Sequence, residues 1–240
     1  MMNLTETVLY SCGISLFTSF GIQKVEAKRP NILFIMTDQQ RYDMLSCAGN
    51  RYVHTPSLDQ LAENGVRFER NYCANPVSMP SRFAMITGRF AGEIGYTNNS
   101  TKPDTLRVLP VARESSVGNL FRNAGYETIY SGYPGFYCGR TDITDYGFIQ
   151  NGMDFYDGPS NFAESFFAGY KPEEDKPFFL YLSFMNPHDI CYGAGFDPRF
   201  PDKLRPHQIA ATQKYINFRK TLSEEEYRNQ IPPVPANMEP

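Results

Sequence analysis

The chain contains no tryptophan, no block of charge of one sign and no CxxC cysteine pair. Lysine and arginine (23) nearly balance aspartate and glutamate (26), so the sequence does not predict a nucleic-acid partner. Without closely spaced cysteines, neither a zinc site nor a thioredoxin-like redox centre is expected. The five cysteines are irregularly placed, at Cys12, Cys47, Cys73, Cys138 and Cys191, and they leave the question of a disulfide open. After the N-terminal region no segment approaches the ~20 apolar residues of a membrane span.

What is present is a globular composition with a distinct N-terminus. The 240 residues are 41% hydrophobic, enough for one good-sized core. An apolar stretch from Val8 to Ile22 precedes Val25-Glu26-Ala27, which is similar to the small-x-small cleavage pattern of a secretory signal. We therefore predict a signal peptide over residues 1–27 and a periplasmic or secreted location. A misassigned start is the alternative, because no Lys or Arg precedes the stretch.

From Arg29 onward the pattern is that of an α/β domain. The near-continuous apolar run Ile32–Met36 predicts a strand buried on both faces, and the strand and helix alternation predicts a mainly parallel sheet covered by helices on both faces. The predicted strands are 32–36, 66–72, 126–130 and 177–184, and the predicted helices are 56–64, 81–87 and 117–124. Residues 93–107 are expected to form a surface loop, 131–158 loop and a short hairpin, and the region after His188 an exposed excursion.

Two residues near the predicted helix 81–87 could hold an anion. Ser78 comes just before the helix N-terminus, where unpaired N–H groups and the helix dipole favour negative charge. Arg82, one turn into the helix, could neutralise an anion or a neighbouring nucleophile. The plainer interpretation is a serine N-cap and a surface arginine.

Polar residues also follow two predicted strands, at the sheet edge where ligands of open α/β folds bind. Asp38 and Gln39 supply oxygen ligands of the kind that Ca²⁺ or Mg²⁺ takes, although they could instead cap a turn. His188 could donate to a substrate oxygen or a leaving group, although a lone histidine is more often structural.

Several ordered segments resemble the sulfatase family. The opening Arg29–Arg41 is similar to the start of the family, and His54–Ala62 with Gly65–Phe68 is similar to the segment that follows. Ser78-Met79-Pro80-Ser81-Arg82, closed by Thr87-Gly88-Arg89, matches the family signature of Cys or Ser, any residue, Pro, a small residue and Arg. The resemblance runs from about Arg29 to His188.

The resemblance implies an alkaline-phosphatase-like α/β fold and a sulfuric ester hydrolase that acts on sulfated carbohydrates. In such enzymes the signature residue is oxidised to formylglycine, whose hydrated aldehyde attacks sulfur and later expels sulfate. By this resemblance Ser78, Arg82 and His188 are catalytic, and Asp38, Gln39 and Ser78 bind calcium, with magnesium the less favoured ion. A serine-type signature implies a formylglycine-generating maturase and a bacterial setting. The alternatives are a phosphoester or phosphonate hydrolase of the same superfamily, or a non-catalytic fragment that binds anions or glycans.

The chain departs from the family pattern in two places. Where the family carries Gly-Lys-x-His, this chain has Gly132-Tyr133-Pro134-Gly135, so that Lys102 or another cation would have to substitute. The later Asp followed by Asn or His, which completes the family's metal site, is absent from 189–240. We therefore expect residues 28–240 to be the N-terminal part of a sulfatase catalytic domain, incomplete and truncated.

Overall fold

The computed structural model describes residues 29–99, 110–133, 143–151, 157–172, 176–188 and 216–230, the last with a gap at 219, together with residues 209 and 213. The predicted signal peptide and Lys102 lie outside these residues. The chain divides into two units, residues 1–30 and 31–240, and the description below concerns the second. Within the described residues no helix has the length and apolar character needed to cross a membrane.

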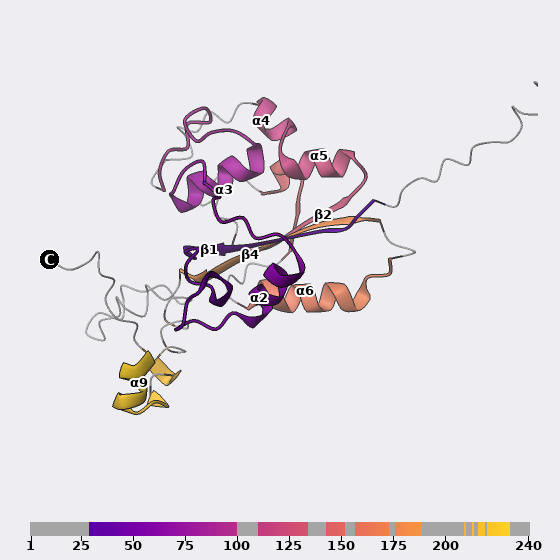
Figure 1. The fold of residues 1–240 in the computed structure, drawn as a ribbon. Helices are drawn as coiled ribbons and strands as arrows, with labels where there is room; N and C mark the ends of the chain where they lie inside the picture. The colour runs from indigo at the N-terminus through magenta and orange to yellow at the C-terminus, as the bar shows by residue number, and fades with distance from the viewer. Residues whose placement is uncertain are drawn as a thin grey trace, which may run out of the picture. The chain divides into compact units, whose positions relative to one another are not determined.

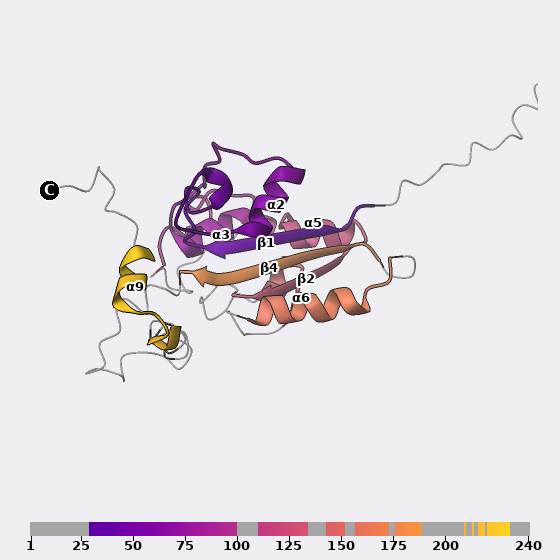
Figure 2. The ribbon, with the colours of Figure 1, turned by 60° about the horizontal axis from the view of Figure 1, so that its bottom comes forward.

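A parallel four-stranded sheet forms the centre of this unit. Its strands are β1 (Ile32–Asp38), β2 (Glu127–Gly132), β3 (Ile149–Asn151) and β4 (Phe178–Pro187), in the order β1-β4-β2-β3. Figure 2 shows β1, β4 and β2 side by side. All three strand pairs are parallel. The prediction of a mainly parallel sheet is confirmed.

Helices cover both faces of the sheet. One face packs under α3 (Ser78–Thr87) and α5 (Val117–Asn123), where Phe83, Tyr96, Tyr130 and Phe148 form an aromatic core (Figure 1). The other face packs on α6 (Gly158–Gly169), with its phenylalanines against β4. The remaining elements are the short 3-10 helices η1 (Ser46–Ala48) and η3 (Ile143–Tyr146) and the helices α2 (Pro56–Asn64), α4 (Pro110–Glu114) and α9 (Glu224–Gln230).

Parallel pairing brings the carboxyl ends of β1, β2 and β4 to one edge of the sheet. Ser183 of β4 is in register with Met36 of β1 on one side and with Gly132 of β2 on the other. Asp38, the last residue of β1, and Tyr133, the residue after β2, therefore lie at the same edge. This edge is where side chains from three strands can meet.

The structure corrects three predictions about strands. Residues 66–72 form no strand, and their apolar side chains are exposed: Val66 by 79%, Phe68 by 77% and Tyr72 by 86%. A strand with alternating apolar residues is stabilised only by a pairing neighbour, and no described strand pairs with this segment.

The run Ile32–Met36 is not buried on both faces, because β1 is an edge strand in the described sheet and α6 packs on β2 and β4 instead. The predicted hairpin within 131–158 is wrong where described, because β3 pairs parallel with β2.

Three described helices, α4, α6 and α9, are not among the predicted elements. Helix α6 begins at Gly158, the last residue of the segment expected to be loop and a short hairpin, and its apolar face is held by tertiary packing on the sheet. Helix α9 occupies part of the region expected to be an excursion. In the predicted helix 81–87, by contrast, only the start is wrong, because α3 begins three residues earlier, at Ser78.

Candidate active site

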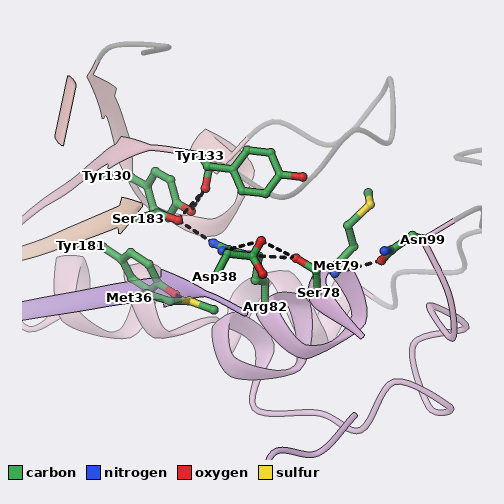
Figure 3. Close-up of polar contacts among 10 residues, drawn as sticks. All are labelled: Met36, Asp38, Ser78, Met79, Arg82, Asn99, Tyr130, Tyr133, Tyr181 and Ser183. Carbon is green, nitrogen blue, oxygen red and sulfur yellow. Dashed lines mark hydrogen bonds and ion pairs between the residues drawn. The ribbon is translucent and has the colours of Figure 1, made fainter. Parts of the chain in front are cut away.

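Ser78 and Asp38 meet at the carboxyl edge of the sheet. Ser78 is the first residue of α3 and Asp38 the last of β1. The Ser78 hydroxyl donates a hydrogen bond of 2.9 Å to Oδ2 of Asp38 (Figure 3). Asp38 is 8% exposed, so neither it nor Ser78 acts as a simple surface turn or cap.

Arg82 lies one turn further along α3 and is buried, with 1% of the residue exposed. Its Nε donates to the Ser78 hydroxyl over 3.4 Å, and its Nη2 lies 3.2 Å from Oδ2 of Asp38. The second contact is an ion pair without an aligned hydrogen bond, because Nη2 has no hydrogen-bond partner among the described residues. A buried guanidinium needs a charge partner, and Asp38 supplies it. The interpretation of Arg82 as a surface side chain is wrong.

Three further residues surround Arg82: Ser183 and Tyr130, which the sequence did not single out, and Tyr133, which it marked only as a departure from the family pattern. Nη1 of Arg82 donates to the Ser183 hydroxyl over 2.5 Å, and that hydroxyl donates to the Tyr133 carbonyl over 2.6 Å. The Tyr130 hydroxyl donates to the same carbonyl over 2.7 Å. The ring of Tyr133 lies 5.0 Å from Cζ of Arg82, within the range of a cation–π contact. A signal for Ser183 did exist, since it is the one serine in the largely apolar, buried part of β4.

Burial makes two tyrosines near this network, Tyr130 and Tyr181, harder to ionise. Burial raises the pKa of Tyr130 to about 12, although the Ser183 hydrogen bond and the Arg82 charge act in the opposite direction. Burial also raises the pKa of Tyr181, and the neighbouring Tyr130 adds to the effect. Both phenols therefore remain protonated around neutral pH, and Tyr130 can serve as a hydrogen-bond donor there.

The N-terminus of α3 offers an anion fewer donors than expected. The N-cap is Val77, not Ser78, and it makes no side-chain cap. The N–H of Met79 donates to Oδ1 of Asn99 over 3.1 Å, and Pro80 has no N–H. Positive charge at the site therefore comes chiefly from Arg82.

The residues expected to bind calcium are too few to form a coordination shell among the described residues. Asp38 lies at the site, and Gln39 follows in a left-handed conformation, with φ 62°, that turns the chain at the end of β1. Calcium takes six to eight oxygens, whereas the described residues hold no cluster of three or more His, Cys, Asp or Glu side chains. The oxygens of Asp38 and Ser78 meet and fit one side of such a site without completing it, and the role of Gln39 stays a prediction.

His188 follows directly after β4 and is half-buried. Its backbone N–H donates to the Met185 carbonyl over 3.0 Å. It lies at the strand end that carries Ser183, as expected, and its contact with a substrate stays a prediction.

Comparison with known proteins identifies the family. The family model described as sulfatase matches residues 30–225. An N-acetylglucosamine-6-O-sulfatase of Bacteroides thetaiotaomicron is 35% identical over 54% of this chain and 22% of that protein. Human arylsulfatase D is 32% identical over 69% of this chain and 30% of that protein. The chain thus spans less than a third of the length of either relative.

A solved structure from Bacteroides thetaiotaomicron, of a protein assigned to the sulfatases, has the same architecture. It superposes with a TM-score of 0.59 at 24% identity and covers 71% of this chain and 38% of that one. This likeness confirms the alkaline-phosphatase-like fold class, including its parallel sheet between helices. With a matching family model over most of its residues, the chain belongs to the sulfatase family.

Proposed function

We propose that this chain is part of the catalytic domain of a sulfuric ester hydrolase that acts through a formylglycine at Ser78. The observation that carries the proposal is the position of the Ser78 hydroxyl, 2.9 Å from Oδ2 of Asp38 and 3.4 Å from Nε of Arg82. A side chain held between a buried carboxylate and a buried guanidinium is oriented before any substrate binds, with a positive charge beside it.

The residues around Ser78 divide the work between them. Asp38 accepts the hydrogen bond of Ser78 and so fixes the direction of its side chain. Arg82 places a permanent positive charge beside the same atom, where an attacking oxygen or a bound sulfate would carry negative charge. Formylglycine, when formed, supplies a hydrated aldehyde as nucleophile, a chemistry that serine lacks. His188 would contact the sulfate or the leaving group from the end of β4.

Calcium is part of the proposal. Asp38, Gln39 and Ser78 would hold it from one side, and the other ligands would come from outside the described residues. Calcium would offset the charge of the sulfate group. We prefer calcium to magnesium because magnesium demands near-ideal octahedral geometry.

The proposed substrates are sulfated carbohydrates, hydrolysed in the periplasm or outside the cell. The substrate class is supported by the names of bacterial relatives, an N-acetylglucosamine-6-O-sulfatase and an N-acetylgalactosamine-6-O-sulfatase. A formylglycine-generating maturase is the proposed protein partner. The location rests on the predicted signal peptide.

The decisive experiment is mass spectrometry of the peptide around Ser78 after co-expression with a bacterial maturase. We expect oxidation at Ser78 and none at Ser81, which lies in the same signature and serves as an internal control. Unmodified Ser78 would remove the proposed nucleophile. Hydrolysis of an aryl sulfate and an aryl phosphate is then compared, with Ser78→Ala as the inactive control. A clear preference for the phosphate would favour the phosphoester or phosphonate hydrolase instead.

A second candidate is a non-catalytic anion-binding or glycan-binding protein. It is favoured by Tyr133, whose ring lies over Arg82 at the position where the family pattern has lysine. Binding of a sulfated sugar without turnover, by a chain that is oxidised at Ser78, would support this candidate over the hydrolase.

A further inference from the structure

The three nitrogens of the Arg82 guanidinium face oxygens from three different elements. Nε faces Ser78 of α3, Nη2 faces Asp38 of β1, and Nη1 faces Ser183 of β4. We propose that Ser183 is a positioning residue that fixes the plane of this guanidinium and thereby sets the anion affinity of the site. The proposal rests on the proposed function in one respect only, namely that the anion is a sulfate.

The direction of the hydrogen bonds at Ser183 is determined by its chemistry. A serine hydroxyl has one proton to donate, and here it goes to the Tyr133 carbonyl over 2.6 Å. The lone pairs of the hydroxyl are then left to accept, and Nη1 of Arg82 donates to them over 2.5 Å. A hydroxyl polarised by its own donated bond is a better acceptor, so the chain from Arg82 through Ser183 to Tyr133 is mutually reinforcing.

Tyr133 is itself held in place by β4. Its N–H donates to the Ser183 carbonyl over 2.8 Å, and its carbonyl also accepts from the Tyr130 hydroxyl over 2.7 Å. This close approach needs glycine at the preceding position, because a Cβ on Gly132 would lie 2.1 Å from the Ser183 carbonyl oxygen. The same attachment holds the Tyr133 ring over the guanidinium. Ser183 therefore restrains Arg82 directly and through Tyr133.

The ion pair with Asp38 cannot perform this task alone. Nη2 is 3.2 Å from Oδ2 but makes no aligned hydrogen bond with the described residues, so the contact restrains distance more than orientation. The bond of Nε to Ser78, at 3.4 Å, is long. The bond from Nη1 to Ser183 is the shortest of the three and is the one that sets the tilt of the plane (Figure 3).

The test compares Ser183→Ala with a matched control, Ser116→Ala, in the full 240-residue chain. Ser116 is also 0% exposed, and its hydroxyl also donates to a backbone carbonyl, that of Tyr146, over 3.0 Å. It belongs to neither the hydrogen-bond network nor the ion pair of Arg82. Both variants lose one buried hydroxyl, so a purely structural role would affect the two alike.

Two measurements are made on each variant. The first measurement records the heteronuclear NMR signals of the Arg82 guanidinium. These signals are assigned by their disappearance in Arg82→Lys. We expect separate signals for the two Nη groups in the wild type and in Ser116→Ala, and averaged signals in Ser183→Ala. The second is titration with inorganic sulfate, whose affinity we expect Ser183→Ala to weaken about tenfold, the scale of one hydrogen bond to a charged group.

The two measurements separate this proposal from the proposed function. A wild type that binds no sulfate would count against the proposed function, and the Arg82 signals would still decide the role of Ser183. Separate Arg82 signals in Ser183→Ala would overturn the positioning role. If Ser183→Ala fails to fold, Ser183→Cys provides the test, because it keeps the side-chain shape but offers a weak acceptor. Unchanged Arg82 signals in Ser183→Cys would likewise overturn the proposal.

Discussion

The hydroxyl of Ser78 lies 2.9 Å from Oδ2 of Asp38, although the two residues are 40 positions apart in the sequence. The same carboxylate oxygen faces Nη2 of Arg82 at 3.2 Å. One oxygen thus orients the proposed nucleophile and balances a buried positive charge. Because of this double role, we expect both the stability and the proposed activity to depend on Asp38.

Replacing Asp38 by asparagine should lower the free energy of unfolding by about 3 kcal/mol, because Arg82 would remain buried without a charge partner. The matched control is Asp43→Asn, which breaks an exposed ion pair of 2.7 Å with Arg41 and should cost at most about 1 kcal/mol. Urea unfolding of both variants measures the difference. Equal losses of unfolding free energy in the two variants would mean that buried Arg82 does not need Asp38 as its charge partner.

Gly132→Ala should lower the free energy of unfolding by at least about 2 kcal/mol. The new Cβ would meet the Ser183 carbonyl oxygen, and the φ of 101° at Gly132 is in the left-handed region. Gly169→Ala, at the end of α6, has no atom within 4 Å of its new Cβ and should be neutral or stabilising by up to about 1 kcal/mol. Thermal unfolding would check both. A stable Gly132→Ala variant would contradict the close contact of β2 with β4.

The stability of the protein should fall in alkali because of Tyr130. Its folded-state pKa of about 12 lies above the ordinary value of 10.0, so ionisation favours the unfolded chain. The contribution of the neutral phenol is complete below pH 10 and is lost as the pH rises toward 12. Tyr130→Phe should reduce this loss but not abolish it, because burial also raises the pKa of Tyr181.

The measurement for Tyr130 is the urea midpoint at neutral pH and at a series of pH values above 10. Tyr72→Phe is the control, because Tyr72 is 86% exposed and should leave the alkaline loss unchanged. An alkaline loss as steep in Tyr130→Phe as in the wild type would contradict the prediction.

Asp59 should make the stability of the protein depend on pH in the acid range as well. The Ser46 hydroxyl, which donates to its Oδ2 over 2.6 Å, is the largest cause that lowers the pKa of Asp59 below 3.8, and the Cys47 N–H and Thr55 hydroxyl lower it further. A lowered pKa stabilises the folded state above pH 3.8, and this stabilisation is lost as the pH falls through the folded-state value. Asp59→Asn should therefore flatten the stability profile in this range. Ser46→Ala should flatten it partly, and a profile unchanged in both variants would contradict the assignment.

Much of the fold could be predicted because the relevant signals are local. The apolar run of Phe178–Phe184 indicated a buried strand, and Thr55-Pro56 marked the start of α2. Residues 66–72 carry an equally good strand pattern and form no strand, because an alternating segment adopts strand structure only beside a neighbour. Helix α6 was missed for the opposite reason, since its packing on β2 and β4 outweighs the glycine and proline at its start.

Local pattern located Asp38 at a strand end and Ser78 and Arg82 at a helix start, and the resemblance to the sulfatase family then singled them out as site residues. Their hydrogen bonds and ion pair, the burial of Arg82 and the participation of Ser183 and Tyr133 could not be obtained in this way. Ser183 and Tyr133 meet Arg82 because parallel pairing sets Gly132 of β2, the residue before Tyr133, beside Ser183 of β4. The sequence therefore points to the proposed reacting groups, whereas the pairing of distant strands establishes which groups hold them in place.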